Sequence, residues 1–179
     1  MMQAIDGIGI FTPRDARDTA EWRRIARFVA STPRAFGRDA HIGGHVTGSA
    51  FVLSPDRRCT LLTHHAKLGI WLQLGGHCDG IADAGFTALK EAYEESGLTR
   101  IKLLSPAVYD IDIHEIPANA RDPAHLHYDI RYLMQAQAGK IAPTAESNAL
   151  KWVPLDRLHQ YSGAPSVLRL RDRLADFAE

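Results

Sequence analysis

The stretch that decides the fold is residues 76–98, which read GHCDGIADAGFTALKEAYEESGL. Its second half has the composition of a helix from about residue 84 to residue 96. On such a helix Glu91, Glu94 and Glu95 stand at positions i, i+3 and i+4, so all three side chains project from one side. Like charges at these spacings each cost about 0.2–0.5 kcal/mol. A helix that carries such a cluster usually has a cation to hold, so a cation site is one interpretation of this segment.

A helical wheel predicts which side of this helix is buried. At roughly 100° per residue, Phe86, Leu89 and Tyr93 fall together, and the three glutamates fall on roughly the opposite side. We therefore expect the apolar side to face the core and the carboxylates to be accessible. Carboxylate oxygens suit Mg²⁺ and Mn²⁺, which can neutralise charge on a phosphoryl group and activate water.

The glycines before the helix help to separate a metal site from an ordinary acidic surface. Taken alone, the acidic cluster favours a solvated helix face. Gly75 and Gly76 end a short apolar segment just before the loop. At this point the backbone must turn sharply and can offer a carbonyl oxygen to a metal. The glycines and glutamates together favour a metal site.

Residues 76–98 resemble a Nudix box, which has the pattern G-x5-E-x7-R-E-U-x-E-E-x-G-U, where U is an aliphatic residue. The spacing fits without gaps, and the resemblance extends over about residues 45–160. The chain departs from the pattern at Ala82, in place of the early glutamate, and at Lys90, in place of the arginine. Lysine keeps the positive charge but loses the planar fork that orients a carboxylate. The matching positions are Gly76, Glu91, Glu94, Glu95, Gly97 and Leu98.

The resemblance implies an α/β (α+β) fold, in which an α/β/α sandwich surrounds a mixed β-sheet. It implies hydrolysis of a diphosphate bond in a nucleoside diphosphate linked to another moiety, with Mg²⁺ or Mn²⁺ as the cofactor. The implied metal ligands are Glu91, Glu94 and Glu95, together with the carbonyl of Gly76 or of its neighbour Gly75. The implied catalytic residues are Glu94, Glu95 and, on a late loop, Glu146, for which a surface acid is the alternative.

Two other functions are compatible with a resemblance of this kind. An isopentenyl diphosphate isomerase needs a cysteine and a glutamate across the substrate, and Cys78 is present. However, Cys78 does not stand in the cysteine-glycine-histidine context of that family. A non-catalytic module that senses a nucleotide is favoured by Ala82 and Lys90, whereas the three retained glutamates argue against it.

Residues 126–135 alternate like a strand and supply candidates for substrate binding. His127, Asp129 and Arg131 share one face, where they either line a substrate cleft or face water. The guanidinium of Arg131 suits bidentate contacts with phosphate. His77 directly follows the glycine pair and is a fourth candidate. A metal set of His125, His127 and Asp129 is the alternative, but no second ligand pair at a zinc spacing accompanies it.

The composition limits the class of partner. The chain has 179 residues, 45% of them hydrophobic, and its 21 basic residues balance 21 acidic ones. A net charge of zero provides no field for nucleic acid or a membrane surface, so we expect a small nucleotide-type substrate. We expect Cys59 and Cys78 to be reduced thiols in a cytoplasmic protein, since neither a signal peptide nor a membrane span is recognisable.

We expect residues 1–36 to form an N-terminal helical extension and residues 37–179 to form the Nudix-like domain, within a single globular unit. An amphipathic helix is predicted over residues 18–30, with Asp18 and Glu21 as its capping box. This helix would either pack on its own chain or mediate a homodimer. The other predicted elements are strands at 46–53, 59–65, 101–116 with a break near Pro106, 126–135 and 151–153, and a helix at 165–178.

Overall fold

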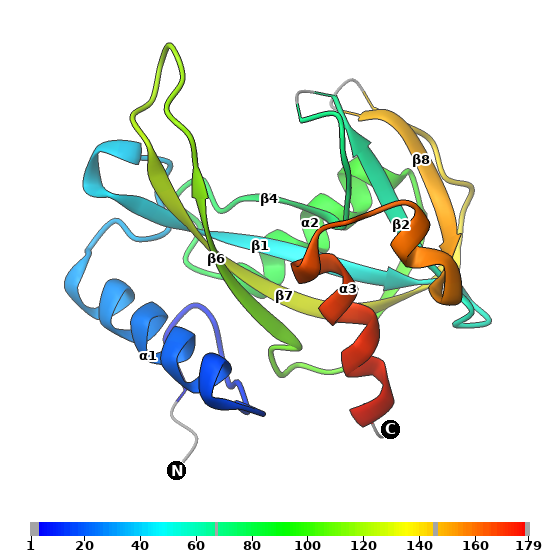
Figure 1. The fold of residues 1–179 in the computed structure, drawn as a ribbon, viewed down its shortest axis with the longest axis horizontal. Helices are drawn as coiled ribbons and strands as arrows, with labels where there is room; N and C mark the ends of the chain where they lie inside the picture. The colour runs from blue at the N-terminus through cyan, green and yellow to red at the C-terminus, as the bar shows by residue number, and fades with distance from the viewer. Residues whose placement is uncertain (1–3, 67, 145–146, 178–179) are drawn as a thin grey trace. The chain divides into compact units, whose positions relative to one another are not determined.

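The computed structural model describes residues 4–66, 68–144 and 147–177. Figure 1 shows their arrangement. The helices are α1 (Ala16–Ser31), α2 (Ala84–Ser96) and α3 (Pro165–Asp172), with short 3-10 helices η1 (Ala40–Ile42), η2 (Leu155–Gln160) and η3 (Arg173–Asp176). The strands are β1 (Gly44–Leu53), β2 (Cys59–His65), β3 (Trp71–Leu72), β4 (Leu74–His77), β5 (Arg100–Leu103), β6 (Asp110–Ile116), β7 (His125–Ala138) and β8 (Ser147–Pro154).

The strands pair in the order β3-β2-β1-β7-β5, while β4 also pairs with β1, β6 with β7 and β8 with β2. The predicted mixed α+β class is confirmed by this sheet and its helices. The predicted strand at 101–116 is two strands, β5 and β6, which are separated by the irregular segment around Pro106. Both of these strands run antiparallel to β7.

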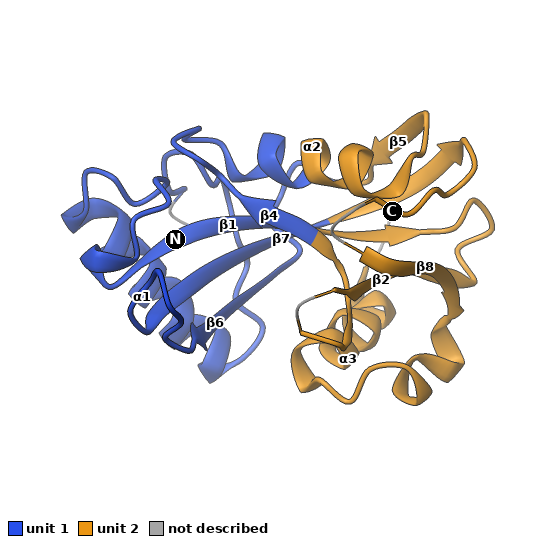
Figure 2. Ribbon diagram, turned by 90° about the horizontal axis from the view of Figure 1, so that it is seen from above, with its two compact units in different colours: residues 1–49, 75–88, 105–132 blue, residues 50–74, 89–104, 133–179 orange. Residues whose placement is uncertain are grey.

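The chain divides into two compact units, each built from three segments (Figure 2). Unit 1 comprises residues 1–49, 75–88 and 105–132, and unit 2 comprises residues 50–74, 89–104 and 133–179. Four of the five boundaries fall inside β1, β4, α2 and β7, and the fifth falls in the connection between β5 and β6. The expected division at residue 36 stays a prediction.

In unit 1, α1 begins two residues before its predicted start. Asp15 is the N-cap, and its carboxylate accepts a hydrogen bond from the Asp18 amide at 2.7 Å. The predicted capping box of Asp18 and Glu21 is therefore wrong. Asp18 is fully buried, and its carboxylate accepts from the Arg14 amide and pairs with the Arg17 guanidinium. The burial of this carboxylate was not visible in the helical pattern.

The buried stripe of α2 differs from the one that the helical wheel predicts. Phe86 is 53% exposed, and the fully buried residues instead include the small side chains of Ala84, Ala88 and Ala92. In unit 1, the burial of these small side chains follows from the close packing of α2 on β1. A Cβ atom at Gly48 would overlap with the Ala84 carbonyl oxygen and the Ala88 amide nitrogen. Large side chains at this contact would hold the two backbones apart.

The core of unit 2 joins β2, β8 and the C-terminal helices. Leu62, Val153, Leu158 and Val167 form a fully buried cluster there. The predicted hairpin of β1 and β2 is confirmed by their antiparallel pairing at Leu53 and Thr60. The predicted C-terminal helix continues as an α-helix only to Asp172 and then tightens into η3.

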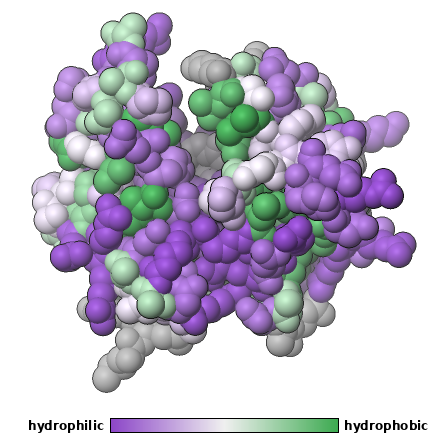
Figure 3. Space-filling view, viewed as in Figure 1, coloured by the Kyte–Doolittle hydropathy of each residue, from purple (hydrophilic) through white to green (hydrophobic). Residues whose placement is uncertain are grey.

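The face shown in Figure 3 is largely hydrophilic, and hydrophobic residues appear on it as separate patches. The expected homodimer stays a prediction. Within the described residues, no helix is both long and apolar enough to cross a membrane. The exposed large hydrophobic residues are Ile10, Leu68, Ile70, Ile81, Phe86 and Leu103.

Candidate functional site

Unit 1 gathers five histidines, which we call the histidine cluster: His45, His77, His114, His125 and His127. They come from four strands, β1, β4, β6 and β7. Strand β4 pairs with β1, and His114 lies opposite His127 in the β6–β7 ladder. The ring of His127 lies 4.7 Å from that of His45 and 5.1 Å from that of His77, measured between centroids. Sheet pairing therefore brings these imidazoles into contact.

Three members of the cluster converge on one point. One ring nitrogen from each of His45, His77 and His127 lies within 4.8 Å of the other two. In the described parts of the chain, this is the one group of three or more His, Cys, Asp or Glu side chains with that convergence. Both ring nitrogens of His45 and Nε2 of His127 are buried without a hydrogen-bond partner. Each such nitrogen costs about 1–3 kcal/mol unless something binds it.

The surroundings of the cluster favour uncharged imidazoles. Burial, followed by the neighbouring His77 and His125, lowers the pKa of His45 to about 4. Burial, followed by His45 and His77, lowers the pKa of His127 to about 2. Both rings are therefore neutral near pH 7, which is the form that ligates metal ions.

The two remaining members of the cluster have partners on one nitrogen. Nδ1 of His125 lies 2.8 Å from the Pro123 carbonyl oxygen, which can only accept a hydrogen bond. Nδ1 must therefore carry the proton, and Nε2 carries the lone pair. Nδ1 of His114 lies 3.1 Å from Oδ2 of Asp112, another acceptor. The same reasoning assigns the proton of a neutral His114 to Nδ1.

A buried ionic network adjoins the cluster on β6 and β7. The Arg131 guanidinium donates from Nε to Asp129 at 2.7 Å and from Nη1 to Asp110 at 3.1 Å, and it pairs with Asp112 at 3.4 Å. Burial alone would lower the pKa of Arg131, but the three carboxylates outweigh burial and raise it above its ordinary value. Thr47 and Ser49 donate to the other oxygen of Asp129.

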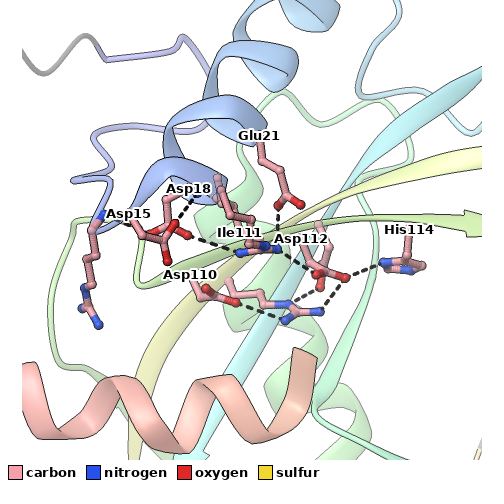
Figure 4. A network of polar contacts seen from close by, with 11 residues as sticks. Asp15, Asp18, Glu21, Asp110, Ile111, Asp112 and His114 are labelled. Carbon is pink, nitrogen blue, oxygen red and sulfur yellow. Dashed lines mark hydrogen bonds and ion pairs between the residues drawn. The ribbon is translucent and has the colours of Figure 1, made fainter. Parts of the chain in front are cut away.

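Helix α1 extends this network through Arg17, and Figure 4 labels Asp18, Glu21 and Asp112, the three carboxylates with which Arg17 pairs. The Arg17 guanidinium contacts Asp112 at 3.0 Å, Asp18 at 3.2 Å and Glu21 at 2.6 Å, and it donates to the Ile111 carbonyl. Asp112 therefore receives cationic groups from α1 and β7 as well as the ring of His114. The network holds α1 against β6 within unit 1.

The structure places the four predicted substrate residues in two groups. His77 and His127 meet in the histidine cluster, whereas Asp129 and Arg131 belong to the ionic network. Asp129 and Arg131 are each 2% exposed, so the alternative that they simply face water is wrong. A contact between these residues and a substrate stays a prediction.

In unit 2, α2 carries what we call the glutamate segment, residues 90–95. The Lys90 ammonium donates to Glu91 at 3.0 Å and to Glu94 at 2.6 Å. These contacts, first with Glu94 and then with Glu91, raise the pKa of Lys90 above its ordinary value. The Glu91 side chain is 14% exposed and that of Glu94 is 57% exposed, while Glu95 is partly buried. Two carboxylates thus share one cation, and their oxygens fit a hard divalent ion.

Three other sequence candidates lie apart from the glutamate segment. Glu146 is outside the described residues. Gly76 belongs to β4 in unit 1, and its expected carbonyl contact stays a prediction. Cys78 is 1% exposed, and burial raises the pKa of its thiol to about 11, which disfavours a reactive thiolate. Cys78 and Cys59 are both free thiols.

Sequence reasoning missed His45, although a signal was present. The triplet Gly-Gly-His occurs at residues 43–45 and again at residues 75–77. In the structure these triplets lie at the beginning of β1 and the end of β4, which pair with each other. A repeated triplet of this kind can therefore indicate that two distant histidines meet.

No protein-family model and no curated protein sequence matches this chain. Solved structures do match it, although their sequence identities are low. An Ap4A hydrolase of C. elegans has a TM-score of 0.59 and 14% identity over 74% of this chain and 96% of its own. The Nudix hydrolase RenU of M. smegmatis has a TM-score of 0.55 and 21% identity over 74% and 85%. A NUDIX-family hydrolase of Clostridium perfringens has a TM-score of 0.53 and 23% identity over 73% of this chain and 96% of its own.

These three proteins share their fold with the chain over most of their own length. The chain therefore has a Nudix-like fold, as the motif at residues 76–98 led us to expect. At this level of identity the likeness concerns the fold, and the reaction has to be argued from the residues themselves.

Proposed function

We propose that the chain is a metal-dependent hydrolase of the Nudix type, which cleaves a diphosphate bond in a nucleoside diphosphate linked to another moiety. The observation that carries the proposal is the shared cation of Glu91 and Glu94 on α2 of a Nudix-like fold. Two carboxylates that already hold one cation together can exchange an ammonium for a divalent ion. The expected substrate is a small nucleotide-type molecule, and the expected location is the cytoplasm.

Glu91, Glu94 and Glu95 would hold Mg²⁺ or Mn²⁺. When bound, such an ion supplies charge neutralisation at the phosphoryl group and a more acidic water. Lys90 holds Glu91 and Glu94 close together, because its ammonium binds both carboxylates. A divalent ion that binds the same oxygens would have to displace this ammonium.

The chain itself must accept the proton of the attacking water. Glu94 and Glu95 are the proposed acceptors, and Glu146 is a further candidate. Glu94 has the more exposed carboxylate, and Glu95 is partly buried. Of the four substrate residues expected from the sequence, Asp129 and Arg131 are proposed as substrate contacts.

The solved relatives suggest which substrates to try first. Their names include an Ap4A hydrolase, a dihydroneopterin triphosphate pyrophosphohydrolase of E. coli and an ADP-ribose pyrophosphatase of Streptococcus suis. A suitable panel therefore holds dinucleoside polyphosphates, nucleoside triphosphates, ADP-ribose, NDP-sugars and NADH. Each compound is incubated with the protein and Mg²⁺ or Mn²⁺, and release of phosphate-containing products is measured.

The matched variants are Glu95→Gln and Glu115→Gln. Glu95→Gln should lower kcat by about 10²–10⁴-fold, the usual contribution of a general base. Glu115 is an exposed residue of β6 in unit 1, so Glu115→Gln should leave kcat unchanged. Equal turnover by the wild type and Glu95→Gln would overturn the assignment to the glutamate segment.

A nucleotide-sensing module is the second candidate function. Lys90 already neutralises part of the charge on Glu91 and Glu94, which favours binding without turnover. Tight nucleotide binding with no product from any compound in the panel would select this alternative. The isomerase alternative receives no support, because the Cys78 thiol is buried and its pKa is raised.

A further inference from the structure

We propose that unit 1 contains a second metal site, in which the imidazoles of His45, His77 and His127 bind one transition-metal ion of the Zn²⁺ class. This inference does not rest on the hydrolase proposal, because the ligands lie in the other unit and have different chemistry. It replaces a substrate role for His77 and His127 with a metal role. The ligand set consists of nitrogen atoms, which suit Zn²⁺, Ni²⁺ or Cu²⁺ better than Mg²⁺.

The convergence of the three rings carries the proposal. Nitrogens bound to a tetrahedral Zn²⁺ at about 2.0–2.1 Å lie roughly 3.4 Å from one another. The ligand atoms of the trio lie within 4.8 Å of one another, so small ring rotations would reach that spacing. Paired strands supply the rings, and this places the ligands on rigid elements before any ion arrives.

The unpartnered nitrogens are the second, independent observation. His45 is 2% exposed, and neither of its ring nitrogens has a hydrogen-bond partner among the described residues. Nε2 of His127 is also buried without a hydrogen-bond partner. Buried polar atoms are nearly always satisfied in folded proteins, so these unpartnered nitrogens call for a ligand. One metal ion would bind one nitrogen of each ring.

His125 is the candidate for a fourth ligand. Its ring centroid lies 5.0 Å from that of His45 and 5.4 Å from that of His127. Its Nδ1 proton is held by the Pro123 carbonyl, which leaves the Nε2 lone pair available. Metal-binding histidines commonly have the opposite ring nitrogen anchored to an acceptor in this way.

The direct test uses untagged protein, since a polyhistidine tag would bind the same ions. The protein is stripped with a chelator and titrated with Zn²⁺, or with Co²⁺ as a spectroscopic probe. We expect uptake of one ion per chain, visible absorption bands of nitrogen-bound Co²⁺, and a higher Tm in Zn²⁺. A millimolar excess of Mg²⁺ should not displace the ion. Absence of Zn²⁺ and Co²⁺ binding would overturn the proposal.

Substitutions locate the ion. His127→Leu and His77→Gln should each weaken Zn²⁺ binding by roughly a hundredfold, because loss even of an outer partner costs 10–100-fold. The matched control is His159→Gln, since His159 is exposed and lies in η2 of unit 2. Circular dichroism and Tm of each metal-free variant show whether it folds. Equal Zn²⁺ affinity in the folded His127→Leu and His77→Gln variants would overturn the ligand assignment.

One comparison separates this proposal from the hydrolase proposal. Glu95→Gln should bind Zn²⁺ as the wild type does, even where it loses hydrolytic turnover. Loss of Zn²⁺ uptake in Glu95→Gln with full uptake in His127→Leu would move the ion to the glutamate segment and overturn the histidine site. A protein that binds Zn²⁺ through the trio but hydrolyses nothing would support this site and remove only the hydrolase.

Discussion

The glutamate segment and the histidine cluster differ in the kind of ligand atoms that they present. The glutamate segment lies on one stretch of α2, and its hard oxygen atoms include the 57% exposed carboxylate of Glu94. The histidine cluster takes nitrogen atoms from four strands, and His45 within it is 2% exposed. The glutamate segment can be recognised from the spacing of its residues in the sequence. The histidine cluster forms only when the strands of the sheet pair.

The polar and charged groups of the two regions differ in whether they have partners. Lys90 satisfies Glu91 and Glu94 at a partly exposed position. The ionic network beside the histidine cluster satisfies its own charges, whereas the rings of His45 and His127 retain unpartnered nitrogens.

Removal of Arg131 should produce the largest effect. Arg131→Ala leaves Asp110, Asp112 and Asp129 buried with less cationic compensation, and should lower the free energy of unfolding by about 3–5 kcal/mol. Arg171→Ala is the control, because Arg171 pairs with a 61% exposed Asp172 and should cost below about 1 kcal/mol. Urea denaturation measures both. Similar losses in the two variants would show that the buried network contributes no more than a surface pair.

Acid should destabilise the histidine region in metal-free protein. The folded-state pKa of His45 is about 4, below the ordinary value of 6.5, so the unfolded chain binds the additional proton first. The neutral ring of His45 contributes roughly 3 kcal/mol to the free energy of unfolding above pH 6.5, and this contribution is lost as the pH falls towards 4. Denaturation midpoints between pH 7.5 and pH 4 test this. In His45→Leu the denaturation midpoint should change less with pH. The same slope of midpoint against pH in the wild type and His45→Leu would contradict this prediction.

A Cβ atom at Gly48 should disturb the contact that anchors the beginning of α2 in unit 1. Gly48→Ala places that atom against the Ala84 carbonyl and the Ala88 amide, and overpacking of this kind costs about 1–3 kcal/mol. Gly163 has open space around its Cβ position, so Gly163→Ala should be neutral or stabilise by about 0.4–1 kcal/mol. Thermal unfolding distinguishes the two. Equal Tm values would mean that α2 does not depend on this close approach.

Replacement of Lys90 should have the smallest effect on stability. Lys90→Met breaks contacts of a 37% exposed ammonium, so the free energy of unfolding should change by less than about 1 kcal/mol. The same variant should bind Mn²⁺ more tightly, because no ammonium competes for Glu91 and Glu94. Calorimetric titration measures the affinity, and Lys90→Arg, which keeps the charge, is the control. Weaker Mn²⁺ binding in Lys90→Met would contradict the competition.

The sequence predicted the fold class and most elements because their signals are local. The alternation at residues 126–135 lies within β7, and the helix at residues 84–96 is α2. The helical wheel predicted the wrong buried face of α2. It gave weight to the large apolar side chain of Phe86, whereas the small side chains of Ala84 and Ala88 permit closer packing on Gly48. A hydrophobicity pattern records apolar area and carries no information on how near two backbones come.

By itself, the sequence determined the glutamate segment. The positions i, i+3 and i+4 share a helix side whatever surrounds them, because helix geometry fixes that relation. Only the tertiary structure decided the histidine cluster and the burial of Asp129 and Arg131. Their contacts depend on which strands pair and in which register, and a shift of one residue would turn each of these side chains to the opposite face of the sheet.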